Sequence, residues 1–286
     1  MLFIVGAIIV IVSVIGGYLG VGGHLAVLWQ PFEFVIIFGA SVGAFLIANP
    51  KSILSRVGGA FSSMMKGSRY DRAAYLELLT LQYSLFKLAK SKGMLALESH
   101  VEKPLESSIF QKFPVFLADH HAVTFLCDYL RLLTLGTDNP HEVEALMDEE
   151  LETHHAEQAQ LSAAVLTMSD GMPALGIVAA VLGVIHTMGS ITEPPEVLGH
   201  LIGGALVGTF LGVLLSYGFV GPIGNAIKNT YDAESKYLMC VKAGILAFMQ
   251  GYAPAVAVEF ARKSLLSNVR PSFYEVEEAV AALPPI

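Results

Sequence analysis

Basic side chains are missing from two long parts of this 286-residue sequence. Residues 1–50 and 132–227 contain no lysine or arginine, so all 17 basic residues lie within residues 51–131 and 228–270. Charged residues make up only 15% of the chain, whereas 54% of it is hydrophobic. An ordinary soluble domain has about 25% charged residues. This composition excludes a disordered chain, which needs low hydrophobicity and high charge, and it indicates a membrane protein.

Cysteine is also scarce. The two cysteines, Cys127 and Cys240, lie far apart in the sequence. A small secreted domain held together by disulfides is therefore excluded, and two cysteines cannot by themselves complete a tetrahedral metal site. We expect both to be buried, reduced thiols.

Four uncharged stretches are long enough, or nearly so, to cross a membrane as helices, which takes about 20 apolar residues. Lysine and arginine favour the cytoplasmic side. The sequence therefore predicts an all-α integral membrane protein with four transmembrane helices, a large helical cytoplasmic loop and a cytoplasmic C-terminal tail. The predicted order is transmembrane helix 1 (1–20), periplasmic turn (21–31), transmembrane helix 2 (32–49), cytoplasmic loop (50–170), transmembrane helix 3 (171–191), periplasmic turn (192–197), transmembrane helix 4 with its inner extension (198–227) and cytoplasmic tail (228–286).

The end of the cytoplasmic loop is strongly acidic. Residues 138–157 contain eight acidic residues and no basic one, equal in size to the net charge of −8. Asn139 and Pro140, with Glu142 after them, are typical of a helix start. Since no strong breaker precedes Gly171, this helix is predicted to continue into the third span, with the acids on a solvated face.

Small residues occur at every fourth position of the fourth span, as Gly204, Gly208, Gly212 and Ser216. This spacing lets another helix approach closely, and we expect tight contacts with other chains, although ordinary packing within the bundle would need the same pattern. Thr209 adds a hydroxyl to this span, which commonly bonds to the carbonyl four residues earlier.

Two prolines mark the predicted inner ends of adjacent spans, Pro173 opening the third and Pro222 closing the fourth. A proline removes a helix hydrogen bond and permits a kink. It also suits a plain helix start. Because the two prolines are predicted at the same membrane depth, they either form a hinge in the two helices or simply mark the helix ends, and the sequence leaves both alternatives open.

Motifs of catalytic or metal chemistry are lacking. No glycine-rich phosphate loop, nucleophile elbow or zinc motif is present. Glu152 and His155 form one Glu-x-x-His pair, but a di-iron bundle needs two such pairs with further glutamates. We therefore expect no enzyme, no metal site, no organic cofactor and no nucleic-acid partner.

Intramembrane carboxylates usually mark proton pathways. No acidic or basic residue lies in the predicted hydrocarbon segments if Glu33 sits in the headgroup layer. If this chain handles protons, the carboxylate must then come from a partner.

The sequence resembles the family of the flagellar stator protein MotA, within the wider group that includes ExbB and TolQ. The likeness covers nearly the whole chain. It is carried by Gly16-Gly17-Tyr18-Leu19, Gln30-Pro31-Phe32-Glu33, Glu144-Ala145-Leu146-Met147-Asp148-Glu149-Glu150, Pro173-Ala174-Leu175-Gly176-Ile177-Val178-Ala179-Ala180-Val181, Val207-Gly208-Thr209-Phe210-Leu211-Gly212, Tyr217-Gly218-Phe219, Val258-Glu259-Phe260 and Arg270-Pro271-Ser272-Phe273.

The resemblance implies a subunit of a motility and chemotaxis machine in the bacterial inner membrane, with both termini cytoplasmic. It implies five copies around two B subunits, whose single span supplies a proton-binding aspartate. An ExbB-like or TolQ-like energiser of outer-membrane transport is the alternative.

The resemblance also implies roles for single residues. Pro173 and Pro222 would couple ion passage to conformational change, and Thr209 and Ala180 would face the channel. Three charged residues would contact the rotor switch protein FliG, namely Lys90, Lys92 and Glu98. Sodium-type relatives have threonine where Ala180 stands, and a methyl group offers no oxygen ligand to sodium, so protons are the expected coupling ion.

Overall fold

The computed structural model of the chain describes residues 2–67 and 69–284, and within these ranges it contains helices and no strand. The longer helices are α1 (Leu2–Gly20), α3 (Pro31–Ala48), α4 (Lys51–Lys66), α5 (Arg72–Lys92), α8 (His120–Thr134), α9 (Pro140–Met188), α10 (Pro195–Leu215), α11 (Gly221–Met249), α12 (Pro254–Lys263) and α13 (Phe273–Ala281). The shorter ones are α2 (Leu25–Leu28), η1 (Met94–Leu97), α6 (Glu98–Glu102), η2 (Pro104–Glu106), η3 (Phe110–Lys112), α7 (Pro114–Leu117) and the π-helix η4 (Ser216–Val220).

Four helical stretches of the described chain are long and apolar enough to span a membrane, which confirms the predicted fold class. They are Leu2–Gly20, Leu25–Ala48, Pro140–Met188 and Pro195–Met249. The last two extend far beyond the predicted spans because the helices continue into charged sequence. As the lack of a breaker indicated, α9 is one helix of 49 residues.

Two parts of the predicted chain order differ in detail in the structure. Residues 198–227 are helical throughout, but the π-helix η4 interrupts the regular α-helix between α10 and α11. The connection between the third and fourth spans lies three residues earlier than the turn predicted at residues 192–197, since α9 ends at Met188 and α10 begins at Pro195. Proline suits this first helical position, where its missing amide hydrogen would have no partner within the helix.

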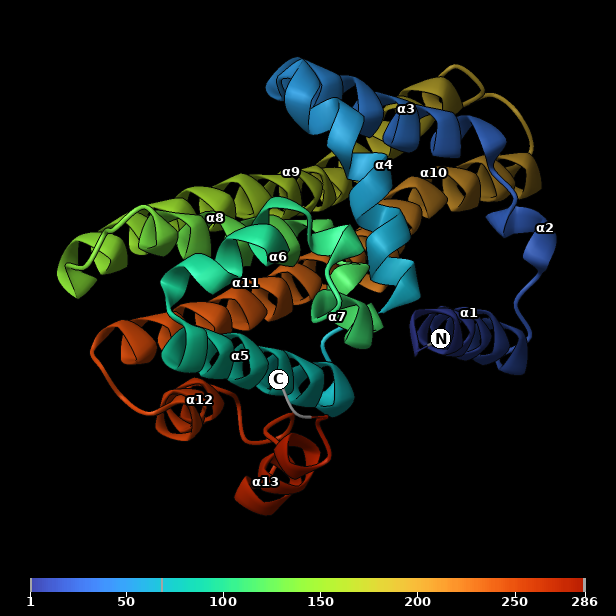
Figure 1. Ribbon diagram of the computed structural model, residues 1–286. Helices are drawn as coiled ribbons and strands as arrows, with labels where there is room; N and C mark the ends of the chain where they lie inside the picture. Colours follow the sequence, from blue (N-terminus) through green and yellow to red (C-terminus); the bar gives the residue numbers. More distant parts are fainter. Residues whose placement is uncertain (1, 68, 285–286) are drawn as a thin grey trace. The chain divides into compact units, whose positions relative to one another are not determined.

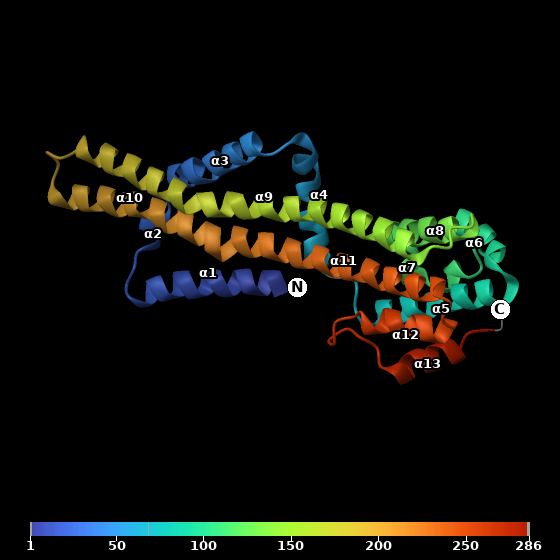
Figure 2. The ribbon, with the colours of Figure 1, turned by 90° about the vertical axis from the view of Figure 1, so that its left-hand side faces the viewer.

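The chain divides into two compact units, residues 1–67 with 157–230 and residues 68–156 with 231–286. The first unit holds the apolar stretches. Helix α3 contacts α10. Figure 2 shows α10 running beside the later part of α9. This helix pair carries the small residues and the prolines singled out in the sequence.

The second unit has a hydrophobic core built around α5. Figure 1 shows α12 and α13 beside α5. Leu78, Leu85 and Phe86 of α5 are fully buried, and the Phe86 ring stacks on Phe248 of α11 with 4.6 Å between ring centroids. Burying one such side chain stabilises the fold by about 1.5–3 kcal/mol, so this core accounts for the helices being held together outside the apolar stretches.

Side-chain caps set where several helices of the second unit begin. Asp71 accepts a hydrogen bond from the Ala74 amide at the start of α5. Ser272 and Glu275 form a reciprocal capping box at the start of α13. Each such cap contributes about 1 kcal/mol by satisfying amides that have no partner within the helix.

Both cysteines are buried and free, as expected from their number and spacing. Burial is the main cause that raises the pKa of Cys127 to about 12, and it raises the pKa of Cys240 as well. Thiols held protonated in this way are unreactive.

The acidic residues 138–157 are only partly a solvated face. Within the second unit, Lys242 lies 2.6 Å from Asp148, and the Tyr129 hydroxyl donates to Glu150 at 2.6 Å. In the first unit, Arg56 lies 3.1 Å from Glu157. Exposed ion pairs of this kind contribute about 0.2–1 kcal/mol each.

Candidate functional site

Helices α9 and α10 approach each other through glycine. A Cβ atom on Gly212 would lie 2.8 Å from the carbonyl oxygen of Met172 and 2.9 Å from Cα of Gly176. A Cβ on Gly176 would in turn lie 2.8 Å from the Gly208 carbonyl oxygen. Real side chains keep carbon atoms about 3.5–4.0 Å from their neighbours, so only glycine permits this separation of the two backbones.

Two members of the small-residue ladder, Gly208 and Gly212, therefore pack within their own chain, as one of the two alternatives for this pattern predicts. Gly208 and Gly212 face α9, and Ser216 is fully buried. Gly204 instead faces the side chain of Gln30, whose Nε2 atom would be 2.9 Å from an added Cβ. Helical spacing predicted the close contact but not its partner.

Glu33 lies at this same glycine contact. Its Oε2 and Oε1 atoms would be 2.7 Å and 3.3 Å from Cβ atoms added to Gly208 and Gly183, respectively. Among the described residues, no hydrogen-bond partner reaches the buried Oε2 atom. Glu33 belongs to the apolar stretch Leu25–Ala48, so that stretch does carry a carboxylate, packed against two helices. The sequence feature that indicates this carboxylate is a single acidic residue within an otherwise uncharged stretch.

Of the two alternatives that the sequence left open at Pro173, a plain helix start does not apply. Pro173 lies inside α9, which continues on both sides of it. Because proline has no amide hydrogen, position 173 cannot donate the usual helix hydrogen bond to the carbonyl oxygen of Ser169, four residues earlier. Pro222 is the second residue of α11, which directly follows η4. The Gly221 amide donates to the Ser216 carbonyl five residues earlier, which is the π-helical hydrogen bond.

One buried side chain joins the two proline regions. The Ser169 hydroxyl donates to the Ser216 carbonyl oxygen at 3.1 Å and lies 3.1 Å from the Ser216 hydroxyl. Ser169 is four residues before Pro173, and Ser216 begins the π-helix before Pro222. Single-turn π-helices frequently occur at functional sites. Sequence reasoning missed Ser169, since a serine in a helix carries no signal of its partner.

Thr209 and Ala180, the two other predicted pathway residues, are both half-buried on the α10 and α9 helices. Thr187 bonds to the carbonyl four residues earlier, at 2.9 Å. No such bond forms at Thr209, and within the described chain its hydroxyl has no hydrogen-bond partner. The common bond of a membrane hydroxyl to its own helix is therefore absent, which leaves this oxygen available to another group.

The three charged residues predicted to contact the rotor are all exposed on the second unit. Lys90 and Lys92 lie in the last turn of α5, and Glu98 is the first residue of α6. Gly93, at a positive φ of 86°, ends α5, and the buried Leu97 anchors the short η1 helix between the two groups. The two lysines at the end of α5 and the glutamate at the start of α6 are thus exposed on either side of η1.

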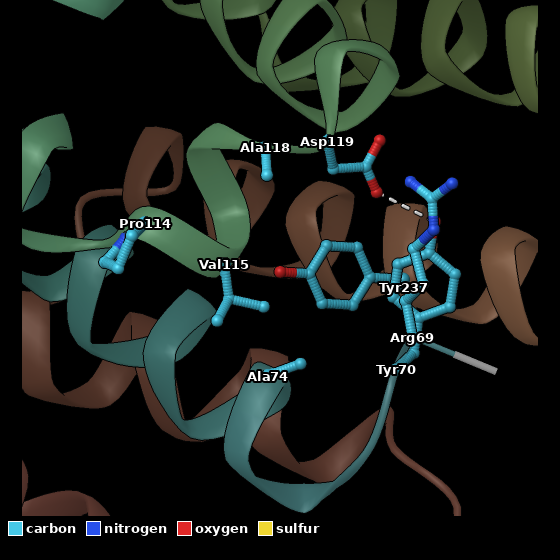
Figure 3. A pocket seen from close by; sticks show the side chains of 8 residues that line it. All are labelled: Arg69, Tyr70, Ala74, Pro114, Val115, Ala118, Asp119 and Tyr237. Carbon is cyan, nitrogen blue, oxygen red and sulfur yellow. Dashed lines mark hydrogen bonds between the residues drawn. The ribbon is translucent and has the colours of Figure 1, made fainter. Parts of the chain in front are cut away.

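The second unit also has a pocket of about 390 Å³, shown in Figure 3. Eight residues line it, namely Arg69, Tyr70, Ala74, Pro114, Val115, Ala118, Asp119 and Tyr237. Its walls are mainly apolar, and the Tyr70 hydroxyl donates to Asp119 at 2.8 Å. Burial is the largest cause that raises the pKa of Tyr70, followed by the Asp119 charge. None of the predicted site residues lies in this pocket.

Comparison with known proteins decides the family. Residues 4–93 match the family described as Motility protein A N-terminal, and residues 118–239 match the MotA/TolQ/ExbB proton channel family. The chain is 44% identical to Motility protein A of Salmonella typhimurium over 283 residues, which cover 99% of this chain and 96% of the relative. The chain belongs to the motility protein A family. Motility protein A of Escherichia coli is 45% identical over the same shares of both chains.

Solved structures of motility protein A complexes have the same fold. The Campylobacter jejuni MotAB chain has a TM-score of 0.79 at 20% identity, and the match covers 94% of this chain and 98% of that one. A chain of the flagellar MotAB stator complex from Bacillus subtilis has a TM-score of 0.75 at 25% identity, covering 96% and 98%. The predicted family is therefore confirmed over nearly the full chain.

Proposed function

We propose that this chain is the A subunit of a flagellar motor stator and not an enzyme. The observation that carries the proposal is the similarity to motility protein A at 44–45% identity over nearly the whole length of both chains. The match of residues 4–93 to the Motility protein A N-terminal family favours this function over an ExbB-like or TolQ-like energiser. Its location would be the bacterial inner membrane with both termini in the cytoplasm, because lysine and arginine favour the cytoplasmic side and all of them lie within residues 51–131 and 228–270.

In this proposal the chain assembles as five copies with two B subunits, which supply the proton-binding aspartate. The B subunit is supported by the MotAB complexes of the structural relatives. Protons are the proposed coupling ion, since Ala180 offers no oxygen to sodium. Lys90, Lys92 and Glu98 would contact the rotor protein FliG, and their exposure at the end of α5 and the start of α6 supports this contact.

Coupling would act through the helix pair α9 and α10. Pro173 and Pro222 each break the regular hydrogen-bond pattern, and the buried Ser169–Ser216 contact links the two breaks. Because a proline position can bend at low cost, a change in charge near Thr209 and Glu33 would be passed to α9 and α11 as a change in helix direction.

Deletion of the gene in its host tests the function. Cells are expected to keep intact but paralysed flagella, and the wild-type gene on a plasmid is expected to restore swimming. Electron microscopy of filaments and tracking of single cells would measure both. Normal swimming in a host without a second stator set would contradict the proposal, and swimming cells that fail in iron uptake would favour the ExbB-like alternative.

Ser169→Ala tests the link between the prolines. Loss of one buried hydrogen bond of about 1 kcal/mol changes the balance between two helix arrangements about fivefold, so swimming is expected to slow several-fold while the amount of protein in the membrane stays unchanged. Ser162→Ala is the matched control, because the Ser162 hydroxyl bonds only within its own helix, to Ala159. Equal swimming speeds of the two variants would contradict the coupling role of Ser169.

A further inference from the structure

Three metal-ligating side chains from three helices meet within the second unit. They are His121 on α8, His154 on α9 and Glu234 on α11. His121 Nδ1 lies 3.3 Å, and His154 Nε2 3.9 Å, from Oε1 of Glu234. One ligand atom from each residue lies within 4.8 Å of the other two. We propose that this cluster binds a divalent transition-metal ion of the Zn²⁺ type, one per chain.

The donor set fits such an ion. Zn²⁺ binds imidazole nitrogen and carboxylate oxygen at about 2.0–2.2 Å in a tetrahedral arrangement, which places neighbouring ligand atoms about 3.3 Å apart. The distance of 3.3 Å from His121 to Glu234 already has this value, and the 3.9 Å from His154 to Glu234 exceeds it by little. Small side-chain rotations would complete three protein ligands, with water as the fourth.

The three side chains of the cluster are partly buried, yet each remains accessible to solvent. The side chains of His121, His154 and Glu234 are 38%, 20% and 22% exposed, so an ion can enter from solvent while three-fifths or more of each side chain is covered. The two imidazole rings stack with 4.0 Å between their centroids and 23° between their planes, so each ring restricts the movement of the other. Imidazole nitrogen and carboxylate oxygen are both ligands that Zn²⁺ accepts.

The helix that carries His121 is fixed at its first turn. Asp119 precedes α8, and its Oδ1 atom accepts a hydrogen bond from the Ala122 amide at 3.2 Å. Its Oδ2 atom accepts from the Tyr70 hydroxyl at the wall of the pocket in Figure 3. Because His121 lies between Asp119 and Ala122, this cap holds its backbone in place. Preorganised ligands lose less freedom when the ion binds, which strengthens binding.

The proposed site does not include the Glu-x-x-His pair of Glu152 and His155, both of which are exposed. His154, one position before His155, is the histidine that lies near His121 of α8 and Glu234 of α11. The proposal departs from the expectation of no metal site, because that expectation considered only the Glu-x-x-His pair.

Zinc titration of the purified full chain tests the proposal independently of the motor function. The protein would carry a histidine-free purification tag and be stripped with a chelator before titration with Zn²⁺, followed by metal analysis after dialysis. The expected result is one Zn²⁺ per chain, and Co²⁺ in its place is expected to show the intense visible absorption of a four-coordinate site. His121→Asn and His154→Asn are each expected to weaken binding about 100-fold or more.

His155→Asn is the matched control, because it removes the adjacent, exposed histidine of the same helix and is expected to bind Zn²⁺ as the wild type does. Circular dichroism shows whether each variant is folded. If both ligand variants fail to fold, Glu234→Gln, which keeps the size of the side chain, replaces them and is expected to bind at least tenfold more weakly. No saturable binding to the wild type at micromolar Zn²⁺, or unchanged binding by the folded ligand variants, would overturn the proposal.

Discussion

Replacing Pro173 by alanine is expected to leave the protein in the membrane in normal amount and to abolish swimming. Alanine restores the amide hydrogen that proline lacks, and with it a bond to the Ser169 carbonyl worth about 1 kcal/mol. One elementary charge crossing 100 mV supplies roughly 2.3 kcal/mol. Bending α9 would then require breaking this additional hydrogen bond, which costs a large part of the energy that a single ion passage supplies. Tracking of cells that lack their own A subunit would measure the effect, and immunoblots of membranes would measure the amount.

Pro140→Ala is the matched control for this prediction. Pro140 is the first residue of the same helix, where a proline amide would have no partner in any case, so this variant is expected to swim normally. Normal motility of Pro173→Ala, at an equal amount of protein, would show that α9 does not need its missing hydrogen bond for function. A loss of both variants from the membrane would show instead that the prolines serve folding.

Gly212→Ala is expected to abolish swimming through loss of the helix contact itself. The added methyl group would meet two backbone atoms of α9, the Met172 carbonyl oxygen at 2.8 Å and Gly176 Cα at 2.9 Å. Backbone atoms cannot rotate away, so α9 and α10 must separate by roughly 1 Å, and overpacking of this kind typically costs about 1–3 kcal/mol. We expect at least tenfold less assembled protein in the membrane, measured by native gel electrophoresis of detergent extracts.

The control for the glycine contact lies on the same helix. Gly199 has no atom within 4 Å of an added Cβ, so Gly199→Ala is expected to assemble and swim as the wild type does, with slightly better helix propensity. If Gly212→Ala behaves like Gly199→Ala, the close approach of α9 and α10 is not required. If Gly199→Ala fails as well, the outer part of α10 has a contact in the assembly that a single chain does not show.

Local features of the sequence determined the helical architecture. Uncharged stretches of spanning length predicted the four apolar helical regions, and the absence of a breaker before Gly171 predicted one continuous α9. Asn139 and Pro140 predicted its start, where the Asn139 side chain accepts from the His141 amide at 3.1 Å. These features could be read because length, capping and hydrophobic composition act within one segment of chain.

For some residues the sequence indicated the kind of contact or backbone feature but not the neighbouring helix. The ladder of small residues predicted a close helix contact, yet α9 of the same chain is the partner of Gly208 and Gly212. At Pro173 the sequence left a hinge within the helix and a plain helix start as alternatives, and the structure places this proline inside α9. A pattern of small residues shows that another helix can approach closely, but it does not identify that helix.

Only the tertiary structure decided the contacts between distant segments. Glu33 meets Gly208, Ser169 meets Ser216, and His121 and His154 meet Glu234 although three different helices carry them. Composition, periodicity and capping therefore determined the membrane class and the helices of this protein. Its carboxylate at the glycine contact, its link between the prolines and its histidine cluster depend on how those helices pack, because packing is set by many contacts at once and no single segment encodes it.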